Sequence, residues 1–594
     1  MTDRGGTGPA GRGGGLVQVL GRRPRWLVVV AAIWLVVGTG LIVALLVRSR
    51  SDSPTEVTGA ALTSSEVGPD SETAGDSSDT ATSSEVSGES GETSGAEQSN
   101  PESGGTGGID DTEVPDDQSA AGESEHRGPW VDPASSGAPW SAFGAIDGLL
   151  TFRGNPTRSF YGRGPVPTAP EVKWTFDIGC SLSTVGGEDR EWCGTGWTGQ
   201  PLVFPAPGIS NLIADGGGAD EADSGTVDDW WLGVGGYNRA VNFVDPETGR
   251  EVYPPFFTGD IIKGTATVDP DGYPLLYTGS RDDFLHVVAL DRAEPTELWR
   301  LSAEAGGRTL WNNDWDGSPM VLDDFLIVGG ENSRFYVVKL NRAFDPSGSV
   351  TVDPEMVASV EGWDEELLAE LNDVQVSIEN SVAVSGSVAY FANSGGLVQG
   401  WDLAPVADGR PPERVFRFWT GDDTDATVAV DAEGQLYVAS EYERGSARSR
   451  ELGQVFRLDP SNPDDPLVWS LEANNGLDSG VWATPALHRD LVIVAADDGR
   501  VLGIDRETGR LRWTLTLSEP LWSSPVVVDD TLIQGDCFNG LQAYDVSDTS
   551  RRPPQLWALT LDGCVESTPA VWDGWIYVGT RGGLLYGISD GGTG

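Results

Sequence analysis

The feature that most restricts what this chain can fold into is a repeat in its C-terminal part. A short segment, in which a small residue and usually Thr or Ser precede an apolar strand, occurs eight times at intervals of 40 to 65 residues. Repeats on this scale are typical of solenoids and propellers, and blades of four short strands fit the spacing. The eight copies begin at Trp197, Ile262, Trp315, Ile378, Thr424, Val481, Leu521 and Val565.

The clearest repeat, residues 481–515, reads as four strands in succession. An apolar strand follows Thr484 and Pro485, and a second strand, a hairpin with Gly499 and a third strand ending in Asp505 come next. The repeat finishes with a strand that carries Trp513. This order predicts an up-and-down antiparallel meander, the unit of a propeller blade.

The two ends of the repeat region complement each other. The last repeat stops at Asp590 after its third strand, whereas residues 171–178 form a strand with Trp174 that no meander precedes. Pairing the two would close a ring and remove an exposed sheet edge. We therefore predict an all-β fold, an eight-bladed β-propeller over residues 171–590, rather than a parallel β-helix or a two-sheet sandwich, which would not need complementary ends.

An uncharged stretch of 22 residues, 26–47, lies near the N-terminus. At 1.5 Å per residue it is long enough to cross a hydrocarbon core of about 30 Å. Arg residues are concentrated before it, which places the N-terminus in the cytoplasm. We predict a cytoplasmic basic tail (1–25), a single transmembrane helix (26–47) in the cell membrane, and an extracytoplasmic remainder. A cleavable signal peptide is the alternative, although its apolar core is usually shorter and ends at a small-residue site.

Residues 48–128 are rich in Ser, Gly, Thr and acidic residues. Such a segment cannot bury enough apolar surface to offset the entropy of ordering, so we predict a disordered acidic linker. A solvated spacer and a cation-binding acidic brush are both consistent with it. A lead-in segment (129–170) would connect this linker to the propeller.

The charge balance excludes one broad class of partner. Asp and Glu number 91 against 38 Lys and Arg, giving a net charge of −53, which repels phosphate backbones and argues against nucleic acid. Only three His are present, so metal sites and general bases built on His are nearly excluded.

At the repeats the chain resembles the quinoprotein-type, pyrroloquinoline-quinone-like (PQQ-like) propeller family. The segment YVGTRGGLLYGI (577–588) is similar to the signature of its blades, as are DGRVLGID (498–505), Glu507-Thr-Gly509 and Trp513. The lead-in TFRGNPTRSFYG (151–162) resembles that of membrane-attached or secreted members. The resemblance implies the fold strongly and the activity weakly, because this repeat serves both quinone-dependent dehydrogenases and non-catalytic assembly scaffolds.

One position of the repeat varies in chemistry while its neighbours stay alike. The second residue of the repeated segment should lie where each inner strand begins, at one end of the central channel. We interpret this set as a candidate ligand- or partner-binding ring; the alternative is that its side chains only cap the channel. The ring consists of Thr198, Lys263, Asp316, Glu379, Asp425, Trp482, Trp522 and Glu566.

The carboxylates of the ring allow two sharper hypotheses. Asp316, Glu379 and Asp425, with nearby Asn380, could form a Ca²⁺ site or supply an acid and a base. A hydrated acidic rim is the simpler interpretation, and we assign no metal and no catalytic residue. The Asp pairs at 422–423 and 497–498 fall in expected turns, where Asp is favoured for backbone reasons, and receive no site.

The four cysteines allow three pairings. An exported chain meets an oxidising environment, and the order of the strands favours disulfides Cys180–Cys193 and Cys537–Cys564. The first pair would lie between the closing strand and blade 1, and the second would join the loops of blades 7 and 8 on the ring's side of the propeller. Four buried free thiols are the alternative.

The sequence therefore favours a membrane-tethered binding or assembly scaffold for a protein, a cell-wall component or a small ligand, without a cofactor. The alternative is a membrane-attached quinoprotein oxidoreductase with PQQ and Ca²⁺. By resemblance, such an enzyme would hold its quinone between a Trp and a disulfide of adjacent cysteines, and no two cysteines here are adjacent. A glycan-binding module is a third class.

Overall fold

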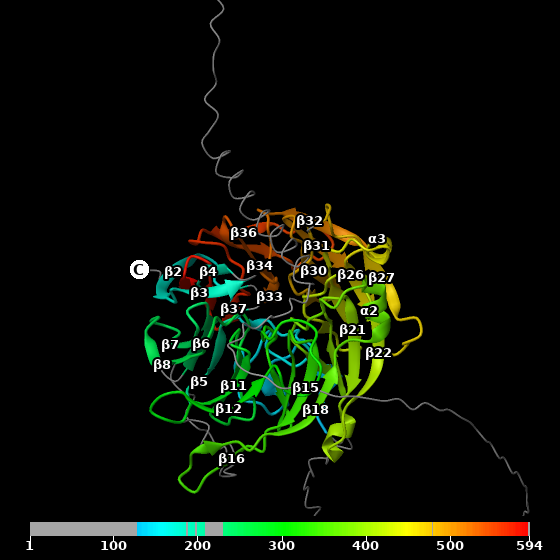
Figure 1. The fold of residues 1–594 in the computed structure, drawn as a ribbon. Coiled ribbons are helices and arrows are strands. Elements are labelled where there is room, and N and C mark those ends of the chain that lie inside the picture. The colour runs from blue at the N-terminus through cyan, green and yellow to red at the C-terminus, as the bar shows by residue number, and fades with distance from the viewer. Residues whose placement is uncertain (1–127, 186–187, 197–198, 208–229, 478, 592–594) are drawn as a thin grey trace, which may run out of the picture. The chain divides into compact units, whose positions relative to one another are not determined.

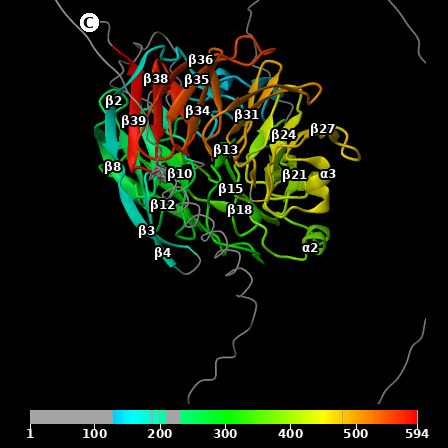
Figure 2. The same cartoon turned by 90° about the horizontal axis from the view of Figure 1, so that it is seen from above.

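The propeller is formed by eight antiparallel sheets that follow one another in chain order. The structure is a computed structural model and describes residues 128–591, apart from 186–187, 197–198, 208–229 and 478. Figures 1 and 2 show the sheets succeeding one another around a ring, from green through yellow and orange to red. The predicted eight-bladed all-β architecture is confirmed.

Each blade has four strands, which are named below in order from the channel outward. Blade 1 comprises β5 (Leu202–Pro205), β6 (Trp230–Gly236), β7 (Ala240–Val244) and β8 (Glu251–Phe257), and blade 2 comprises β9 (Thr267–Val268), β10 (Leu275–Gly279), β11 (Phe284–Ala289) and β12 (Thr296–Ser302). Blade 3 comprises β13 (Met320–Leu322), β14 (Phe325–Gly329), β15 (Arg334–Lys339) and β18 (Glu355–Glu361). Blade 4 comprises β19 (Ala383–Ser385), β20 (Val388–Phe391), β21 (Leu397–Asp402) and β22 (Glu413–Trp419).

Blade 5 comprises β23 (Ala429–Val430), β24 (Leu436–Ala439), β26 (Val455–Leu458) and β27 (Leu467–Leu471). Blade 6 comprises β29 (Ala486–His488), β30 (Leu491–Ala495), β31 (Arg500–Asp505) and β32 (Leu511–Thr516). Blade 7 comprises β33 (Val526–Val528), β34 (Thr531–Asp536), β35 (Gly540–Asp545) and β36 (Gln555–Leu559). Short elements lie outside the blade strands. They include two hairpins, β3 (Cys180–Val185) with β4 (Glu188–Cys193) and β16 (Ala343–Phe344) with β17 (Val350–Thr351), and the strand pair β25 (Glu441–Tyr442) with β28 (Ser479–Gly480). They also include the helices α2 (Glu365–Leu371) and α3 (Ala447–Leu452) and the 3-10 helices η1 (Pro133–Ser135), η2 (Trp140–Phe143) and η5 (Ala404–Asp408).

Blade 8 closes the ring with a strand from the other end of the repeat region. Its inner three strands are β37 (Ala570–Trp572), β38 (Trp575–Gly579) and β39 (Leu584–Asp590), and the outermost is β2 (Pro170–Asp177). β2 pairs antiparallel with β39 from Pro170 opposite Asp590 to Asp177 opposite Leu584, and Figure 2 shows the two strands side by side. The predicted closure is therefore confirmed.

Tryptophans of the outer strands join neighbouring blades. Trp469 of blade 5 donates from Nε1 to the carbonyl of Arg506 in blade 6 at 2.9 Å, and Gly509 of the same blade 6 loop lies against its ring. Trp174 of blade 8 donates in the same way to Pro246 of blade 1 at 3.0 Å. The Gly of the Glu-Thr-Gly motif thus leaves room for the tryptophan of the preceding blade.

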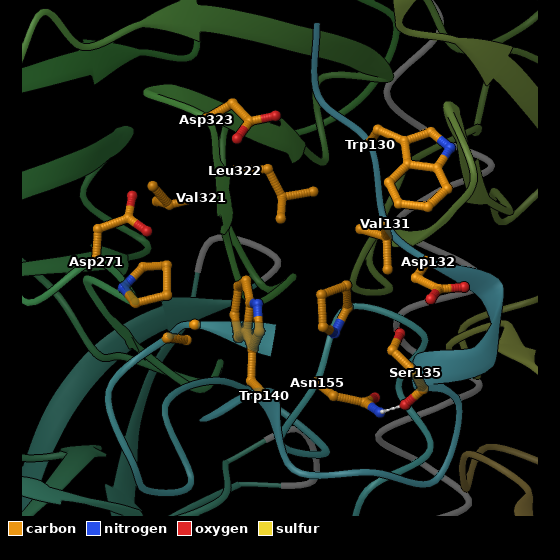
Figure 3. Close-up of a pocket in the computed structure, with 14 residues that line it drawn as sticks. Trp130, Val131, Asp132, Ser135, Trp140, Asn155, Asp271, Val321, Leu322 and Asp323 are labelled. Carbon is orange, nitrogen blue, oxygen red and sulfur yellow. Dashed lines mark hydrogen bonds between the residues drawn. The ribbon is translucent and has the colours of Figure 1, made fainter. Parts of the chain in front are cut away.

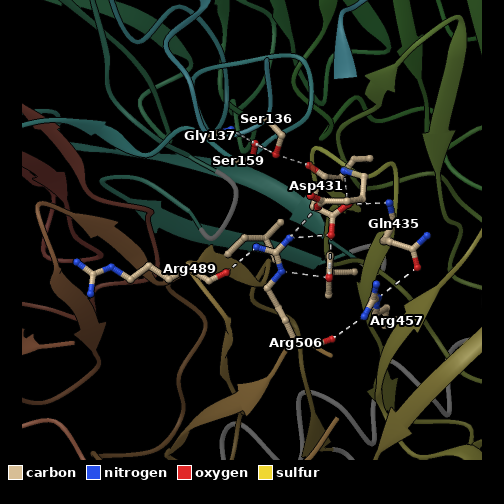
Figure 4. A network of polar contacts seen from close by, with 12 residues as sticks. Ser136, Gly137, Ser159, Asp431, Gln435, Arg457, Arg489 and Arg506 are labelled. Carbon is tan, nitrogen blue, oxygen red and sulfur yellow. Dashed lines mark hydrogen bonds and ion pairs between the residues drawn. The ribbon is translucent and has the colours of Figure 1, made fainter. Parts of the chain in front are cut away.

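A half-buried Arg reinforces the contact between blades 5 and 6 on the side where the inner strands end. Arg506 Nη2 lies 2.7 Å from Asp431 Oδ2, and Arg506 Nε donates to the Tyr437 hydroxyl at 3.2 Å (Figure 4). Blades 2 and 3 use the same arrangement, in which Arg342 binds Asp269 at 2.8 Å. Each pair neutralises a carboxylate that the fold buries.

The lead-in segment fills the central channel. Residues 149–163, which we call the plug, are buried as far as Tyr161 and end in β1 (Gly162–Arg163), which pairs parallel with β37. Backbone or side-chain hydrogen bonds join the plug to the inner strand of every blade, or to one of the two residues before it. The partners are Val203, Val268, Ser318, Val384, Val430, Leu487, Pro525 and Val571.

The predicted membrane helix (26–47), the basic tail before it and nearly all of the acidic linker (48–128) lie outside the described residues. Among the residues that are described, no helix is both long and apolar enough to cross a membrane.

Candidate binding site at the channel mouth

The predicted ring lies where the inner strands begin, and we call this end of the channel the mouth. Seven of its members are described, whereas Thr198 lies outside the described residues. The seven do not form a uniform rim. Carboxylates and the cation Lys263 occupy the mouth at blades 2 to 5, and aromatic side chains occupy it at blades 6 and 7.

On blades 2 to 4 the mouth carries the paired cluster: Asp316, Glu331 and Glu379, whose carboxylate oxygens lie within 4.8 Å of one another. Lys263 Nζ contacts Asp316 Oδ2 and lies 3.3 Å from Glu331 Oε1. Burial would lower the pKa of Lys263, but the charges of Asp316 and Glu331 outweigh it and raise that pKa well above its usual range. The cluster therefore contains its own cation.

On blade 5 the mouth carries the blade 5 triad: Asp423, Asp425 and Glu441, with oxygens again within 4.8 Å of one another. Asp423 and Glu441 are buried. Burial, followed by the repulsion of neighbouring carboxylates, raises the pKa of Asp425 and of Glu441 well above the usual range. Among the described residues no Lys, Arg or His makes an ion pair with the triad.

On blades 6 and 7, Trp482 and Trp522 stack on each other with ring centroids 5.2 Å apart and planes inclined by 14°. Both are half-buried, so each indole presents surface to the mouth. Asp497 lies close by, and burial raises its pKa to about 6. An aromatic pair flanked by carboxylates attracts cations and the apolar stems that carry them.

On blade 8, Glu566 is buried and bound by Arg581, with Nη1 3.2 Å from Oε2. The guanidinium carbon of Arg581 lies 4.9 Å from the ring centroids of both Trp192 and Tyr237. Burial raises the pKa of Glu566, and the charge of Arg581 partly offsets the effect. Glu566 is thus engaged in an internal pair, as Asp316 is with Lys263.

The structure also corrects two interpretations of the acidic residues. Of Asp316, Glu379 and Asp425, only Asp316 is buried, and it is bound by Lys263, so this carboxylate is not part of a hydrated rim; Glu379 and Asp425 are half-buried. The side chain of Asn380, which was considered for the cation site, is bound by the backbone: its amide donates to the carbonyls of Ala392 and Thr424 at 3.1 and 2.8 Å, and its Oδ1 accepts from the Ala392 N–H at 3.2 Å. The Asp pair at 422–423, which the sequence assigned to a turn, contributes Asp423 to the blade 5 triad.

A second ring, which sequence reasoning missed, contributes Glu331, Glu441, Asp497 and Arg581 to these contacts. In each blade the apolar part of the second strand ends in Gly or Ala, and the members of this ring stand two residues after it. The same overlay of repeats could therefore have found them. Because the second strand runs toward the mouth, these side chains lie beside the first ring. They are Tyr237, Arg281, Glu331, Ser394, Glu441, Asp497, Cys537 and Arg581.

Both predicted disulfides are confirmed. Cys180 and Cys193 face each other across the β3–β4 hairpin. Cys537, after β34, is bonded to Cys564, just before the inner strand of blade 8. Both bonds tie loops on the mouth side of the propeller, and no free cysteine remains.

A separate cavity lies at the opposite end of the channel (Figure 3). It has a volume of about 380 Å³ and is bounded by the plug residue Asn155, by Trp130 and Trp140, and by the ends of inner strands at Asp271 and Asp323. Asp271 is bound by Arg342 at 2.8 Å. None of the seven described ring residues lines this cavity.

Comparisons with known proteins agree with the repeat type. Residues 451–592 match the family model described as outer membrane protein assembly factor BamB. Among curated proteins no significant match is found.

The solved structures that match the chain are distant in sequence. The quinohemoprotein alcohol dehydrogenase from Comamonas testosteroni is 12% identical with a TM-score of 0.49, over 74% of this chain and 80% of that one. A europium-containing methanol dehydrogenase is 10% identical with a TM-score of 0.48, over 74% and 98%. The computationally designed protein Ika8 is 12% identical with a TM-score of 0.44, over 60% and 93%. Residues 451–592, which run from the third strand of blade 5 through blade 8, are thus identified as repeats of the type that this family model describes.

Proposed function

We propose that this protein is a binding or assembly scaffold, tethered to the cell membrane by its N-terminal helix, whose propeller binds a cationic segment of a partner protein or cell-envelope component at the mouth. The observation that carries the proposal is the stacked pair Trp482 and Trp522 beside the carboxylate of Asp497. Carboxylates attract Lys or Arg head groups, while indole faces receive their aliphatic stems and add cation–π attraction.

The loops around the mouth favour a macromolecular partner. Leu182, Val374, Leu477 and Phe538 project from four separate loops on this side, and each is at least 50% exposed. Exposed apolar side chains around a polar centre are typical of protein interaction sites. The two disulfides restrain loops on this face, which lowers the entropy cost of ordering them on binding.

The plug gives the mouth a floor. Because residues 149–161 are buried between the inner strands, a ligand that enters the mouth stops there and does not pass through the channel. The geometry therefore supports capture at one face. The large negative charge of the chain would also speed the encounter with a basic partner.

The proposal is tested by titrating the purified extracytoplasmic part, which retains both disulfides, with an oligo-arginine peptide and with an acidic peptide of equal length. We expect saturable binding of the basic peptide, followed by tryptophan fluorescence, at physiological salt. The double variant Trp482→Ala with Trp522→Ala should bind at least tenfold more weakly, since each aromatic contact is worth about 1 kcal/mol. Trp299→Ala, on the outer strand of blade 2, is the control for an indole lost elsewhere.

Two results would contradict the proposal. One is equal binding of the basic and the acidic peptide. The other is a double variant whose thermal stability falls in parallel with its binding, because that would make the two tryptophans core residues.

The alternative function, a quinoprotein oxidoreductase with PQQ and Ca²⁺, fits the described residues less well. By resemblance the quinone would lie between a Trp and a disulfide of adjacent cysteines, whereas the two disulfides join residues 13 and 27 positions apart, and the amide of Asn380 donates to backbone carbonyls. Adding PQQ and Ca²⁺ tests this alternative. Stoichiometric uptake of the quinone with reduction of a dye by alcohols or sugars would establish the enzyme and overturn the scaffold.

A further inference from the structure

We propose that Asp423, Asp425 and Glu441 bind a Ca²⁺ ion at the mouth of blade 5. The three carboxylates come from a stretch of 19 residues within a single blade, and their oxygens lie within 4.8 Å of one another. A cation placed between them would reach all three with small adjustments of their side chains. The site goes beyond the partner-binding role, because it requires neither a partner nor a quinone.

The contrast with the paired cluster supports the assignment. There, Lys263 supplies a positive charge to Asp316 and Glu331. In the blade 5 triad no described Lys, Arg or His is within ion-pair distance. The nearest candidate, Arg444, binds Asp373 at 3.2 Å and donates to the carbonyls of Gln375 and Ser394. Arg444 acts on Asp423 only through its charge, so one acidic cluster holds a cation in direct contact and the other has none in contact among the described residues.

Individual oxygen atoms point to a ligand. Asp423 is only 8% exposed, and its Oδ1 is buried without a hydrogen-bond donor in the described part of the protein. Oδ1 of Asp425 is also buried without a donor. A buried, unpartnered carboxylate oxygen is costly, and a bound cation would satisfy both oxygens.

The ligand chemistry selects the kind of ion. The triad offers only carboxylate oxygens, which hard cations prefer over the nitrogen- and sulfur-seeking transition metals. Ca²⁺ accepts irregular oxygen sets and tolerates additional water ligands. Glu379 interacts electrostatically with the triad, so the local charge exceeds that of the three ligands alone and favours a divalent ion.

The loop that carries Glu441 is held in place independently of any ion. β25 pairs with β28, with Glu441 opposite Gly480. Asp422 accepts hydrogen bonds from the backbone of Arg444 and Gly445 at 2.7 and 2.9 Å. The ligands are therefore pre-positioned, which reduces the ordering cost of binding.

The experiment is a Ca²⁺ titration of chelator-treated protein by isothermal calorimetry, with thermal unfolding measured in parallel. We expect stoichiometric binding in the unmodified protein and a Tm that rises with Ca²⁺ concentration. Asp425→Asn should lose the binding and the Tm shift. In chelator it should be at least as stable as the unmodified protein, because it buries one charge fewer. Glu433→Gln, an exposed carboxylate at the other end of blade 5, is the matched control and should bind Ca²⁺ normally.

The assignment would be overturned by an unmodified protein that binds no Ca²⁺ at millimolar concentration, or by an Asp425→Asn variant that binds it unchanged. Binding that is lost instead in Asp316→Asn would also overturn it, since the ion would then belong to the paired cluster. The titration contains no partner peptide, so its outcome is separate from that of the proposed function.

Discussion

At the scale of the residue, Arg153 and Arg158 are the least expected feature of the molecule. Both are fully buried in the plug. Arg158 donates to the carbonyls of Val382, Phe152 and Ser318 and to Thr151 Oγ1 at 2.8 to 3.1 Å. Burial lowers its pKa to about 9, yet that value still leaves the group charged at neutral pH. These guanidinium groups satisfy carbonyl oxygens that the inner strands leave inside the channel.

Replacing Arg158 with Ala should therefore destabilise the propeller strongly. The change leaves several buried carbonyls without donors and opens a cavity, for a loss of about 3 kcal/mol or more. Thermal unfolding should show a clearly lower Tm, while Arg410→Ala, at an exposed position, should leave the Tm within about a degree or two. Equal effects of the two variants would contradict the role assigned to the plug.

His286 gives blade 2 a stability that depends on pH. Burial would lower the pKa of His286, but hydrogen bonds and charge interactions with Asp282 and Glu297, whose oxygens lie 3.2 and 2.6 Å from its ring nitrogens, outweigh burial and raise it. A raised pKa stabilises the fold fully below the unfolded value of about 6.5. The contribution is lost as pH rises through the folded pKa.

The variant His286→Gln isolates this contribution. We expect the Tm difference between unmodified protein and variant to be largest near pH 6 and to shrink toward pH 9, by about 1.4 kcal/mol of stability for each unit of pKa shift. A difference that is constant over this range, or one that grows with pH, would show that the imidazolium form is not favoured.

At the scale of the element, the blades are held together by tryptophans packed over glycines of the next blade. A Cβ at Gly509 would lie 2.7 Å from the ring of Trp469, and Gly509 has a φ of +69°. Gly574, in the turn between β37 and β38, has a φ of +87° and nothing within 4 Å of such a Cβ. The two positions share the backbone strain and differ in packing.

Gly509→Ala and Gly574→Ala therefore form a matched pair. Each should lose about 1–2 kcal/mol from the left-handed backbone, but only Gly509→Ala should lose a further 1–3 kcal/mol, approximately, from the displaced indole. Thermal unfolding of the two variants measures the difference. Equal destabilisation would mean that the tryptophan contact between blades 5 and 6 contributes little.

The elements also show where sequence reasoning succeeds. The blades, their number and the closing strand follow from a repeat with a fixed place for apolar strands, because each blade buries the same face in the same way. The plug could not be predicted in this manner, since residues 149–163 occur once and their role depends on contacts with all eight inner strands. Similarly, the ring residues from Lys263 to Glu566 could be identified because they occupy the variable position of the repeat. Their contacts with Glu331, Glu441 and Arg581 could not, because these depend on how the loops of the blades meet in space.

At the scale of the whole molecule, the propeller is a closed ring with two unlike ends. One end holds acidic and aromatic side chains, disulfide-restrained loops and exposed apolar residues such as Leu477 and Phe538. The other holds the cavity beside Trp130 and Trp140. The pairing of β2 with β39 closes the propeller, and the plug contacts every blade, so these contacts hold the two ends of the channel relative to each other. Binding at the mouth therefore does not require the propeller to deform.

The most direct test of the central claim is photo-crosslinking in intact cells from one position at each end. A benzophenone side chain at Phe538, on the turn between β34 and β35 at the mouth, should crosslink a specific partner, and the crosslink should weaken when Trp482 and Trp522 are replaced by Ala. The same group at Phe344, in the β16–β17 hairpin at the opposite end, should not crosslink that partner. A specific crosslink from Phe344 alone, or one from Phe538 that is indifferent to the two tryptophans, would contradict a binding site at the mouth.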